Sequence, residues 1–305
     1  MTAAFRRGAK GDLVSVLQRG LQAQGFDPGG VDGDFGGRTE TAVRAFQGGA
    51  GRPVTGAVEA ADWESVVGQP WPELFTRCLQ LTARFEGHSY GKVVGNFDGA
   101  GLTWGVIGFT LQHGGLGSLV LEADAGEPRL LGDCFGEAAA DELRSRLRDD
   151  SAAERLAWAD SISVPPSKVQ VAEPWRSGFL CLGEAPLPQE LQRRKAREKY
   201  FDPAVVTAGR LGLTSDRGIA LCFDVHVQNG GVKQASEQVY QQEVAALPAG
   251  GTERDRRSIL ARLVADSSRP QFRADVLSRK SCIAVGTGAV HGEPFDLDSW
   301  ALADG

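Results

Sequence analysis

The chain has 305 residues, of which 42% are hydrophobic and 24% are charged, so it is long enough for two domains with ordinary hydrophobic cores. Its 33 Lys and Arg residues against 39 Asp and Glu residues give a formal net charge of −6, which lacks the basic surplus that binds nucleic-acid phosphates or anionic lipids. We therefore expect no nucleic-acid partner. Glycine is the outlier, because its 40 residues are about 13% of the chain against a typical usage of roughly 7%.

We expect no export signal at the beginning of this sequence. Met1–Lys10 has two arginines but no apolar core and no cleavage site, and nowhere do ~18 apolar residues follow one another. We expect synthesis in the cytoplasm without a signal peptide, and no membrane span. The five cysteines are scattered singly and without metal-ligand spacing, which predicts buried free thiols, no disulfide framework and no zinc site. They are Cys78, Cys134, Cys181, Cys222 and Cys282. We expect no metal and no cofactor.

Apolar residues at helical spacing predict three short helices within residues 1–68. The first begins at Asp12, the second begins at Thr39, and the third surrounds Trp63. Between the first two helices, residues 28–36 are rich in glycine and aspartate, which favour tight turns. The first 68 residues are therefore expected to form a small three-helix domain around compact loops.

Several short motifs follow one another in this domain. They are Leu17-Gln18, Val31-Asp32-Gly33, Phe35-Gly36, Thr39 and Phe46-Gln47. With these motifs, residues 5–67 resemble the bacterial peptidoglycan-binding domain found at the ends of cell-wall hydrolases and phage endolysins. The resemblance implies loops that line a shallow groove for wall peptide or glycan. It gives the domain four site residues, which are Asp32, Phe35, Thr39 and Phe46.

A second domain is expected over residues 73–305, after a linker at residues 69–72 in which two prolines prevent a helix. Its first helix carries an apolar stripe from Leu74 and ends at Glu86, and residues 93–110 combine glycines with β-branched and aromatic residues, which predicts short strands. Helices are expected at 136–149, 152–161, 189–200, 216–229, 233–247, 253–266 and 270–285. The predicted fold class is mainly α (α+β), with many helices and one small β-hairpin sheet.

Two carboxylates in this domain form a candidate acid–base pair. Glu86 closes an apolar helix, where desolvation disfavours the charged form and keeps a proton available to a general acid. Asp98 lies twelve residues later in a glycine-rich turn, where a carboxylate stays solvated. One protonated and one charged carboxyl group are what glycosidic bond hydrolysis requires. Either residue taken alone is also common at a helix end or in a turn.

The residues around this pair resemble the catalytic core of the chitosanase-like branch of the lysozyme superfamily. The match consists of a helix that ends in Glu86 and the fixed positions of a following hairpin, which are Asp98, Gly99, Gly101, Thr103, Gly105, Ile107, Gly108, Phe109 and Thr110. The resemblance implies a lysozyme-like catalytic domain in which Glu86 is the general acid, Asp98 is the general base and Thr103 helps to hold the attacking water. It also implies inversion at the sugar carbon, with the carboxyl groups ~6.5 to 9.5 Å apart.

Further polar residues are candidate substrate contacts. They are His88, Tyr90, Asp224, His226, Gln228 and Asn229. On helical spacing, Asp224 and Gln228 share one face of the helix at 216–229, and His226 and Asn229 share another. Asp224 in a buried ion pair with an arginine and His226 as a structural histidine are the alternatives, and both amides could simply cap their helix. The absence of HExxH and GxSxG motifs excludes the corresponding metal and serine hydrolases.

Three functions follow from these observations. The first is a monomeric peptidoglycan hydrolase of the muramidase or lysozyme type, brought to the wall by residues 1–68. The second is a chitosanase that acts on polyglucosamine, which would need extra carboxylates to hold the cationic amines. The third is a catalytically inactive wall-binding protein. A wall enzyme without a signal peptide would reach its substrate through a holin, as endolysins do, or through a secretion system.

Overall fold

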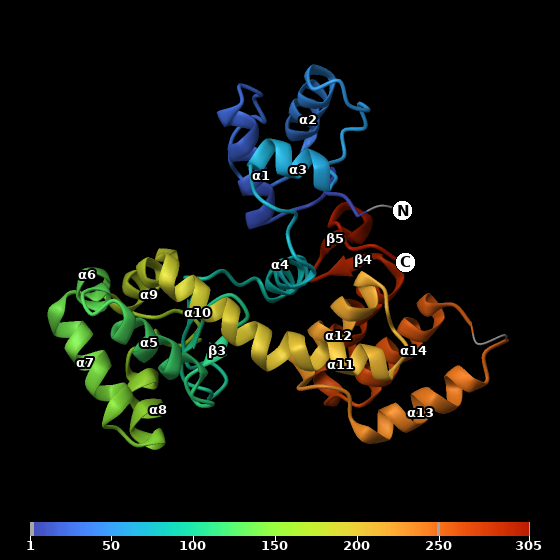
Figure 1. Ribbon diagram of the computed structural model, residues 1–305. Coiled ribbons are helices and arrows are strands. Elements are labelled where there is room, and N and C mark those ends of the chain that lie inside the picture. Colours follow the sequence, from blue (N-terminus) through green and yellow to red (C-terminus); the bar gives the residue numbers. More distant parts are fainter. Residues whose placement is uncertain (1–2, 249–250, 305) are drawn as a thin grey trace. The chain divides into compact units, whose positions relative to one another are not determined.

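The computed structural model describes residues 3–248 and 251–304 (Figure 1). The chain divides into two compact units, one made of the residues up to Phe85 together with those from Tyr200 onward, and the other of Glu86–Lys199. Helices dominate both units and the few strands are short, which confirms the mainly α fold class. Among the described residues, no helix is long and apolar enough to cross a membrane.

The first unit begins with helices α1 (Asp12–Ala23), α2 (Gly37–Gly49) and α3 (Ala60–Val67), at the positions that the apolar spacing predicts. Their apolar faces meet in one core, which contains Leu17, Leu21, Phe35, Val43, Phe46 and Trp63. Gly33 between α1 and α2 has φ +72°, and a Cβ there would lie 2.9 Å from Ser15 Oγ, so this turn favours glycine.

Two buried glutamines hold the loops between these helices. Gln18 donates through Nε2 to Asp32 Oδ1 (2.8 Å) and Thr39 Oγ1 (3.1 Å), and its Oε1 accepts the Gly33 N–H (2.9 Å). Gln47 Nε2 donates to Asp62 Oδ2 (2.8 Å) in the same manner, and both glutamines are only 1% exposed. A buried amide is stable only when it is hydrogen-bonded, so these side chains fix the loop conformations.

The end of the chain completes the core of this N-terminal region. The N–H of Ala301 donates to the carbonyl of Ala4 (3.1 Å), Phe5 forms a bridge with Trp300, and Ala301 belongs to the same hydrophobic core as Leu17. Trp71, in the expected linker, packs against Phe5 with the ring centroids 5.3 Å apart. Residues about 300 positions apart in the sequence therefore share one core.

The rest of the first unit is an assembly of helices with one hairpin. The elements are α4 (Leu74–Glu86), α11 (Asp202–Arg210), α12 (Asp216–Asn229), α13 (Gln234–Ala245), α14 (Glu253–Asp266), the short helix Pro270–Phe272, α15 (Arg273–Val285), β4 (Thr287–Val290), β5 (Glu293–Asp296) and the turn Leu297–Ser299. Helix α15 packs against α14, α12 and β4. Thr252 and Asp255 form the capping box that begins α14, as the sequence indicates.

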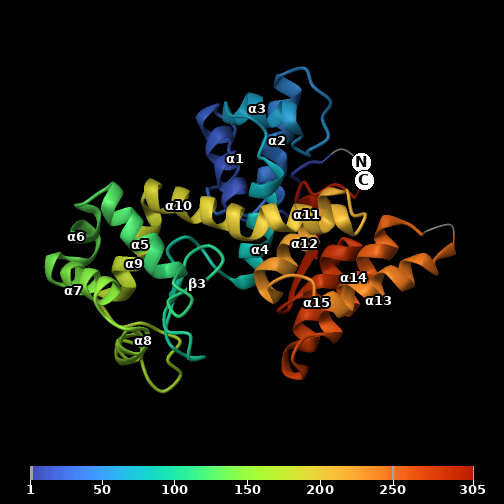
Figure 2. The same ribbon diagram turned by 60° about the horizontal axis from the view of Figure 1, so that its bottom comes forward.

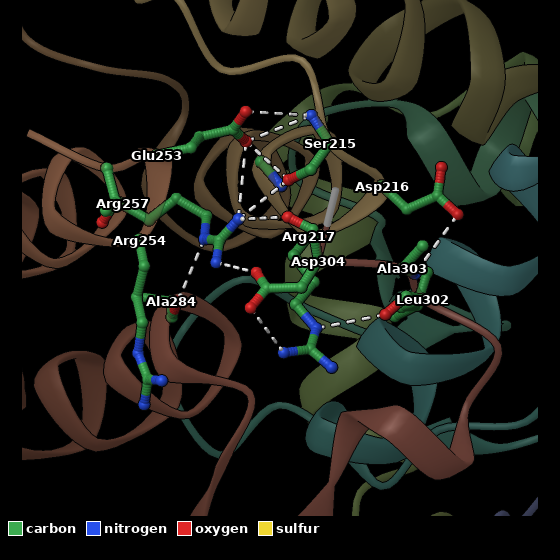
Figure 3. A network of polar contacts seen from close by, with 12 residues as sticks. Ser215, Asp216, Arg217, Glu253, Arg254, Arg257, Ala284, Leu302, Ala303 and Asp304 are labelled. Atoms are coloured by element: carbon green, nitrogen blue, oxygen red, sulfur yellow. Dashed lines mark hydrogen bonds and ion pairs between the residues drawn. The ribbon is translucent and has the colours of Figure 1, made fainter. Parts of the chain in front are cut away.

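A polar network ties the last described residues to α12 and α14 (Figure 3). Arg257 is fully buried, and its guanidinium donates to the Ala284 carbonyl (3.0 Å), to Ser215 Oγ (2.8 Å) and to the carboxylate of Asp304. Arg217 donates to the carbonyl of Leu302 (3.1 Å). Because each buried guanidinium is paired and hydrogen-bonded, the network offsets part of the cost of burying its charge.

The second unit contains the helices that Figure 2 labels α5 to α10, and a small sheet. Its helices are α5 (Gly115–Gly126), α6 (Leu130–Phe135), α7 (Glu137–Arg148), α8 (Ala152–Ser161), α9 (Trp175–Glu184) and α10 (Pro186–Ala196), and a π-helical turn at Arg197–Phe201 follows. Strands β1 (Val93–Val94), β2 (Thr103–Trp104) and β3 (Phe109–Thr110) form an antiparallel sheet in sequence order. The single small sheet expected here is therefore present, with one strand more than a hairpin has.

The sequence did not predict α5, α6, α9 or α11, and glycine explains part of the failure. A glycine inside a helix costs about 1 kcal/mol relative to alanine, so glycine-rich segments do not look helical. In α9, however, a Cβ at Gly178 would lie 2.1 Å from the Phe135 ring, so the glycine lets α9 pack closely on α6. Close packing of the two helices outweighs the weak local preference.

The prediction of five free thiols is wrong for one pair. Cys134 on α6 and Cys181 on α9 form a disulfide with an S–S distance of 2.06 Å. The two positions are 47 residues apart, so their pairing depends on the packing of α6 on α9. The spacing of the cysteines in the sequence could not predict this disulfide. The other three cysteines, Cys78, Cys222 and Cys282, are buried and free, as expected. Burial raises the pKa of the Cys222 thiol to about 12, so this thiol stays protonated and unreactive.

Candidate active site

The loop between β1 and β2 is held at both ends by Asn96. The Asn96 N–H donates to Ser163 Oγ (2.9 Å), its Nδ2 donates to Asp160 Oδ1 (2.9 Å), and its Oδ1 accepts the N–H of Gly101 (2.9 Å). Gly95 lies so close to the segment around Lys168 that a Cβ there would be 2.4 Å from the Lys168 carbonyl oxygen. The loop therefore has a defined shape, which a catalytic group requires of its support.

Asp98 lies at the exposed tip of this loop. Its Oδ1 accepts the N–H of Ala100 (3.0 Å), which closes a local turn and orients the carboxylate. Gly99 and Gly101 in the same turn have φ angles of +86° and +75°, a backbone region that favours glycine. The expectation that Asp98 lies solvated in a glycine-rich turn is confirmed, whereas its role in catalysis stays a prediction.

Thr103 and His88 both lie close to Gly108. Thr103 on β2 is paired with Val94 on β1 and with Thr110 on β3. A Cβ at Gly108 would lie 3.0 Å from Thr103 Cγ2 and 3.1 Å from His88 Nε2. The β2–β3 turn therefore packs against His88, and the structure brings this histidine close to the threonine that the sequence selected separately.

Glu86 is the last residue of α4 and is half-buried. Gly87 follows with φ +59°, which ends the helix, and its carbonyl accepts a hydrogen bond from Lys92 Nζ (2.5 Å). The predicted position of Glu86 at the end of a helix is confirmed. The function of Glu86 as the general acid stays a prediction.

Gln192 is a positioning residue that the sequence analysis missed. Its side chain is fully buried, and Nε2 donates to the carbonyl of Tyr90 (3.0 Å) while Oε1 accepts the N–H of Val106 (2.9 Å). The amide therefore joins the segment after Glu86 to the turn between β2 and β3. Tyr90 itself is half-buried, and whether its ring contacts substrate stays a prediction. No local sequence pattern marks a single glutamine within α10 as such a link.

Asp224 cannot contact a substrate, because its side chain is fully buried. Arg279 donates to its carboxylate through Nε (2.8 Å) and Nη2 (2.6 Å), and Lys280 Nζ (2.5 Å) and Thr82 Oγ1 (3.1 Å) donate as well. Burial alone would raise the pKa of Asp224, but Arg279 and Lys280 outweigh it and lower that pKa to about 2. The substrate-binding prediction for Asp224 is therefore wrong, and the alternative of a buried ion pair with an arginine is confirmed.

The other three candidates on α12 make hydrogen bonds within the first unit. Gln228 donates to Asp275 Oδ2 (3.0 Å) and accepts from Lys280 Nζ (2.7 Å), so it extends the Asp224 ion cluster on the predicted common face. His226 Nε2 is 2.9 Å from Thr207 Oγ1, and burial lowers its pKa. Asn229 Nδ2 lies 3.5 Å from Ser268 Oγ. These contacts give each residue a structural role, and substrate binding by them stays a prediction.

Three of the four site residues expected in the N-terminal region are buried. Phe35, Thr39 and Phe46 are at most 4% exposed, so they build the domain and do not present a contact surface. Asp32 is exposed, and hydrogen bonds from the Asp34 N–H and from Gln18 lower its pKa. The prediction that all four are site residues is corrected accordingly, and Asp32 alone offers a polar group to a ligand. Among the described residues, no group of His, Cys, Asp and Glu has a metal-binding arrangement.

Part of the N-terminal region matches a known family. Residues 10–64 match the family model described as "Putative peptidoglycan binding domain". The type VI secretion system spike protein VgrG3 of Vibrio cholerae serotype O1 is 49% identical over 47 residues, which are 15% of this chain and 5% of that protein. This chain thus matches only a small part of that relative.

Solved chitosanase structures are similar to most of the chain. The native chitosanase from Bacillus subtilis MY002 is 19% identical, with a TM-score of 0.46, over 68% of this chain and 85% of its own. The GH46 chitosanase of Gynuella sunshinyii, solved with chitotetraose, is 18% identical, with a TM-score of 0.48, over 74% of this chain and 98% of its own.

Proposed function

We propose that this protein is a peptidoglycan hydrolase that cleaves the glycan backbone of the cell wall in the manner of a muramidase. The observation that carries the proposal is the presence, in one chain, of a peptidoglycan-binding match at residues 10–64 and a rigid, exposed carboxylate at Asp98. A wall-binding region concentrates the enzyme on its polymer, which favours a wall glycan as the substrate over a soluble one.

The proposed reaction is a single displacement with inversion. Glu86 gives its proton to the glycosidic oxygen as the bond from that oxygen to the sugar carbon breaks. Asp98 accepts a proton from water while the water oxygen bonds to the same carbon from the opposite face, and Thr103 helps to hold the water. The products are a shortened strand with a free hydroxyl and a new reducing end of inverted configuration, and solvent restores both carboxyl groups.

The test uses purified sacculi and an amide substitution of each carboxylate. We expect Glu86→Gln and Asp98→Asn to abolish the release of reducing ends while binding to sacculi stays unchanged. Glu127→Gln and Asp133→Asn are matched controls, because both carboxylates are exposed in the same unit and should keep full activity. Undiminished activity of Glu86→Gln would remove this residue from the mechanism. Sacculus binding without hydrolysis by the unmodified protein would instead support the inactive wall-binding alternative.

Chitosan is the alternative substrate, and the solved chitosanases provide the reason to consider it. A polymer of glucosamine carries an ammonium group on each sugar, so a chitosanase requires carboxylates beyond the catalytic pair. Within residues 95–101, Asp98 is the sole acidic residue. Release of reducing ends from chitosan but not from sacculi would establish the alternative.

We further propose that the protein acts outside the cytoplasm, in the wall or periplasm. The Cys134–Cys181 disulfide supports this location, because disulfides persist in oxidising compartments and are rare in the cytosol. A holin and a secretion system are the two routes considered, and the spike protein similarity favours a secretion system. Loss of wall lysis in recipient cells when the producer lacks its secretion system would support that route, and retained lysis would contradict it.

A further inference from the structure

Phe97 is an exposed aromatic residue immediately before Asp98. Its side chain is 55% exposed, although a phenylalanine usually gains free energy from burial. Single exposed apolar residues are common on proteins, so exposure alone carries no functional meaning. The position of Phe97 within the Asn96-held loop is the second observation.

The backbone before Phe97 is held in place by hydrogen bonds and close packing. The Phe97 N–H donates to the carbonyl of Gly95 (2.9 Å), and both Gly95 and Asn96 are fixed to residues 163–170. The hydrogen bonds that shape the loop involve the backbone and Asn96 and do not use the Phe97 ring. A rigid loop therefore presents an aromatic face and a carboxylate from adjacent positions.

The C–H face of a pyranose ring can pack against the apolar face of an aromatic side chain. The methyl group of an acetamido substituent can pack against it in the same way. An ammonium sugar would also need a carboxylate, but Asp98 is the sole acidic residue of the loop. Asp160, which holds the loop through Asn96 (2.9 Å), is already bound to Lys168 (2.6 Å). The loop is therefore suited to an uncharged sugar.

We propose that Phe97 is a substrate-contact residue that packs against an uncharged, N-acetylated sugar ring beside the bond to be cleaved. The inference rests on the proposed function and adds the residue that sets its sugar preference. A ring held against Phe97 is placed next to the Asp98 carboxylate, where the attacking water must be activated. Phe97 thus contributes binding and orientation, and Asp98 contributes the proton transfer.

The first test is kinetic and uses a soluble N-acetylated wall tetrasaccharide. We expect Phe97→Ala to raise KM about tenfold with kcat changed less than about twofold, because a binding contact is lost without loss of the acid or base. Phe97→Trp should restore KM. Phe272→Ala is the matched control, since Phe272 is 53% exposed and lies far along the chain in the short helix Pro270–Phe272. A KM for Phe97→Ala equal to that of Phe272→Ala would overturn the inference.

The second test measures binding without turnover. In the Glu86→Gln background, tryptophan replaces either Phe97 or Phe272, and fluorescence is followed during titration with the acetylated tetrasaccharide and with a glucosamine tetrasaccharide. A saturable change at position 97 with the acetylated sugar alone supports the inference. The inference is overturned if the fluorescence of the Phe97→Trp variant does not change, or if it changes equally with the glucosamine tetrasaccharide. If the unmodified enzyme cleaves no wall glycan, the proposed function fails, and this titration still decides whether Phe97 binds sugar.

Discussion

Asp98 and Asp224 are both acidic residues that the sequence marks as candidate site residues, but the structure places them in opposite surroundings. Asp98 is exposed and accepts a hydrogen bond from a backbone N–H. Asp224 is fully buried and is bound by Arg279 and Lys280. An exposed carboxylate on a rigid loop can exchange protons with a substrate, whereas a buried, ion-paired one holds helices together.

The largest expected difference between the two aspartates is in stability. Asp224→Asn removes a charge that Arg279 and Lys280 require, so we expect the free energy of unfolding to fall by about 3 to 5 kcal/mol. Asp98→Asn should change it by less than about 0.5 kcal/mol, as is usual for an exposed position. Urea titration of both variants measures their free energies of unfolding directly. Equal stability of the two variants would contradict the comparison.

The disulfide extends the comparison to the second unit, which carries the loop of Asp98. Replacing Cys134 and Cys181 by serine releases a constraint on the unfolded chain, and we expect a loss of about 2 to 4 kcal/mol. Reduction of the unmodified protein should reproduce most of the effect and leave the serine variant unaffected. A serine variant as stable as the oxidised protein would show that the bond adds nothing to stability.

Acid should destabilise the protein partly through Asp224. Its folded pKa of about 2 lies below the ordinary value of 3.8, so its ion pairs stabilise the fold above about pH 4 and are lost as the pH falls toward 2. The difference between the two values corresponds to about 2 kcal/mol. Comparing acid unfolding of the unmodified protein with that of Asp224→Asn isolates the contribution of Asp224 ionisation to the free energy of unfolding. Identical pH profiles, apart from a constant offset, would contradict it.

Removal of the Asn96 side chain should change stability less than the changes at Asp224 or at the disulfide, but it should change activity clearly. Asn96→Ala loses hydrogen bonds to Asp160 and Gly101, so we expect about 1 to 2 kcal/mol of destabilisation and at least about a tenfold loss of kcat/KM. Glu127→Gln is the control, because its carboxylate is exposed in the same unit and lies outside the loop. If Asn96→Ala and Glu127→Gln have equal activity, catalysis does not depend on the hydrogen bonds of Asn96.

Local patterns were sufficient to predict the helices and motifs whose signals lie within a few residues. Helices α1 to α3, the end of α4 at Glu86 and the glycine-rich turn at Asp98 all depend on spacing, caps or turn residues. The motif glutamines Gln18 and Gln47 were visible too, although their role as buried hydrogen-bonding centres required the structure.

The features that were missed depend on contacts between distant segments. The Cys134–Cys181 bond, the link from Gln192 to Tyr90 and the pairing of Phe5 with Trp300 join residues far apart in sequence. Burial of Asp224 likewise depends on α15, some 55 positions away. Periodicity within one helix gives the face on which a residue lies, but not which partner covers that face.

The central claim is that the chain cleaves wall glycan by single displacement with inversion, and the configuration of the first product tests it most directly. Digestion of purified wall glycan can be followed by proton NMR before the new reducing ends interconvert. The account predicts that the α-anomer appears first from the β-linked strand, and that Glu86→Gln produces none. First appearance of the β-anomer, or the absence of any new reducing end, would contradict the account.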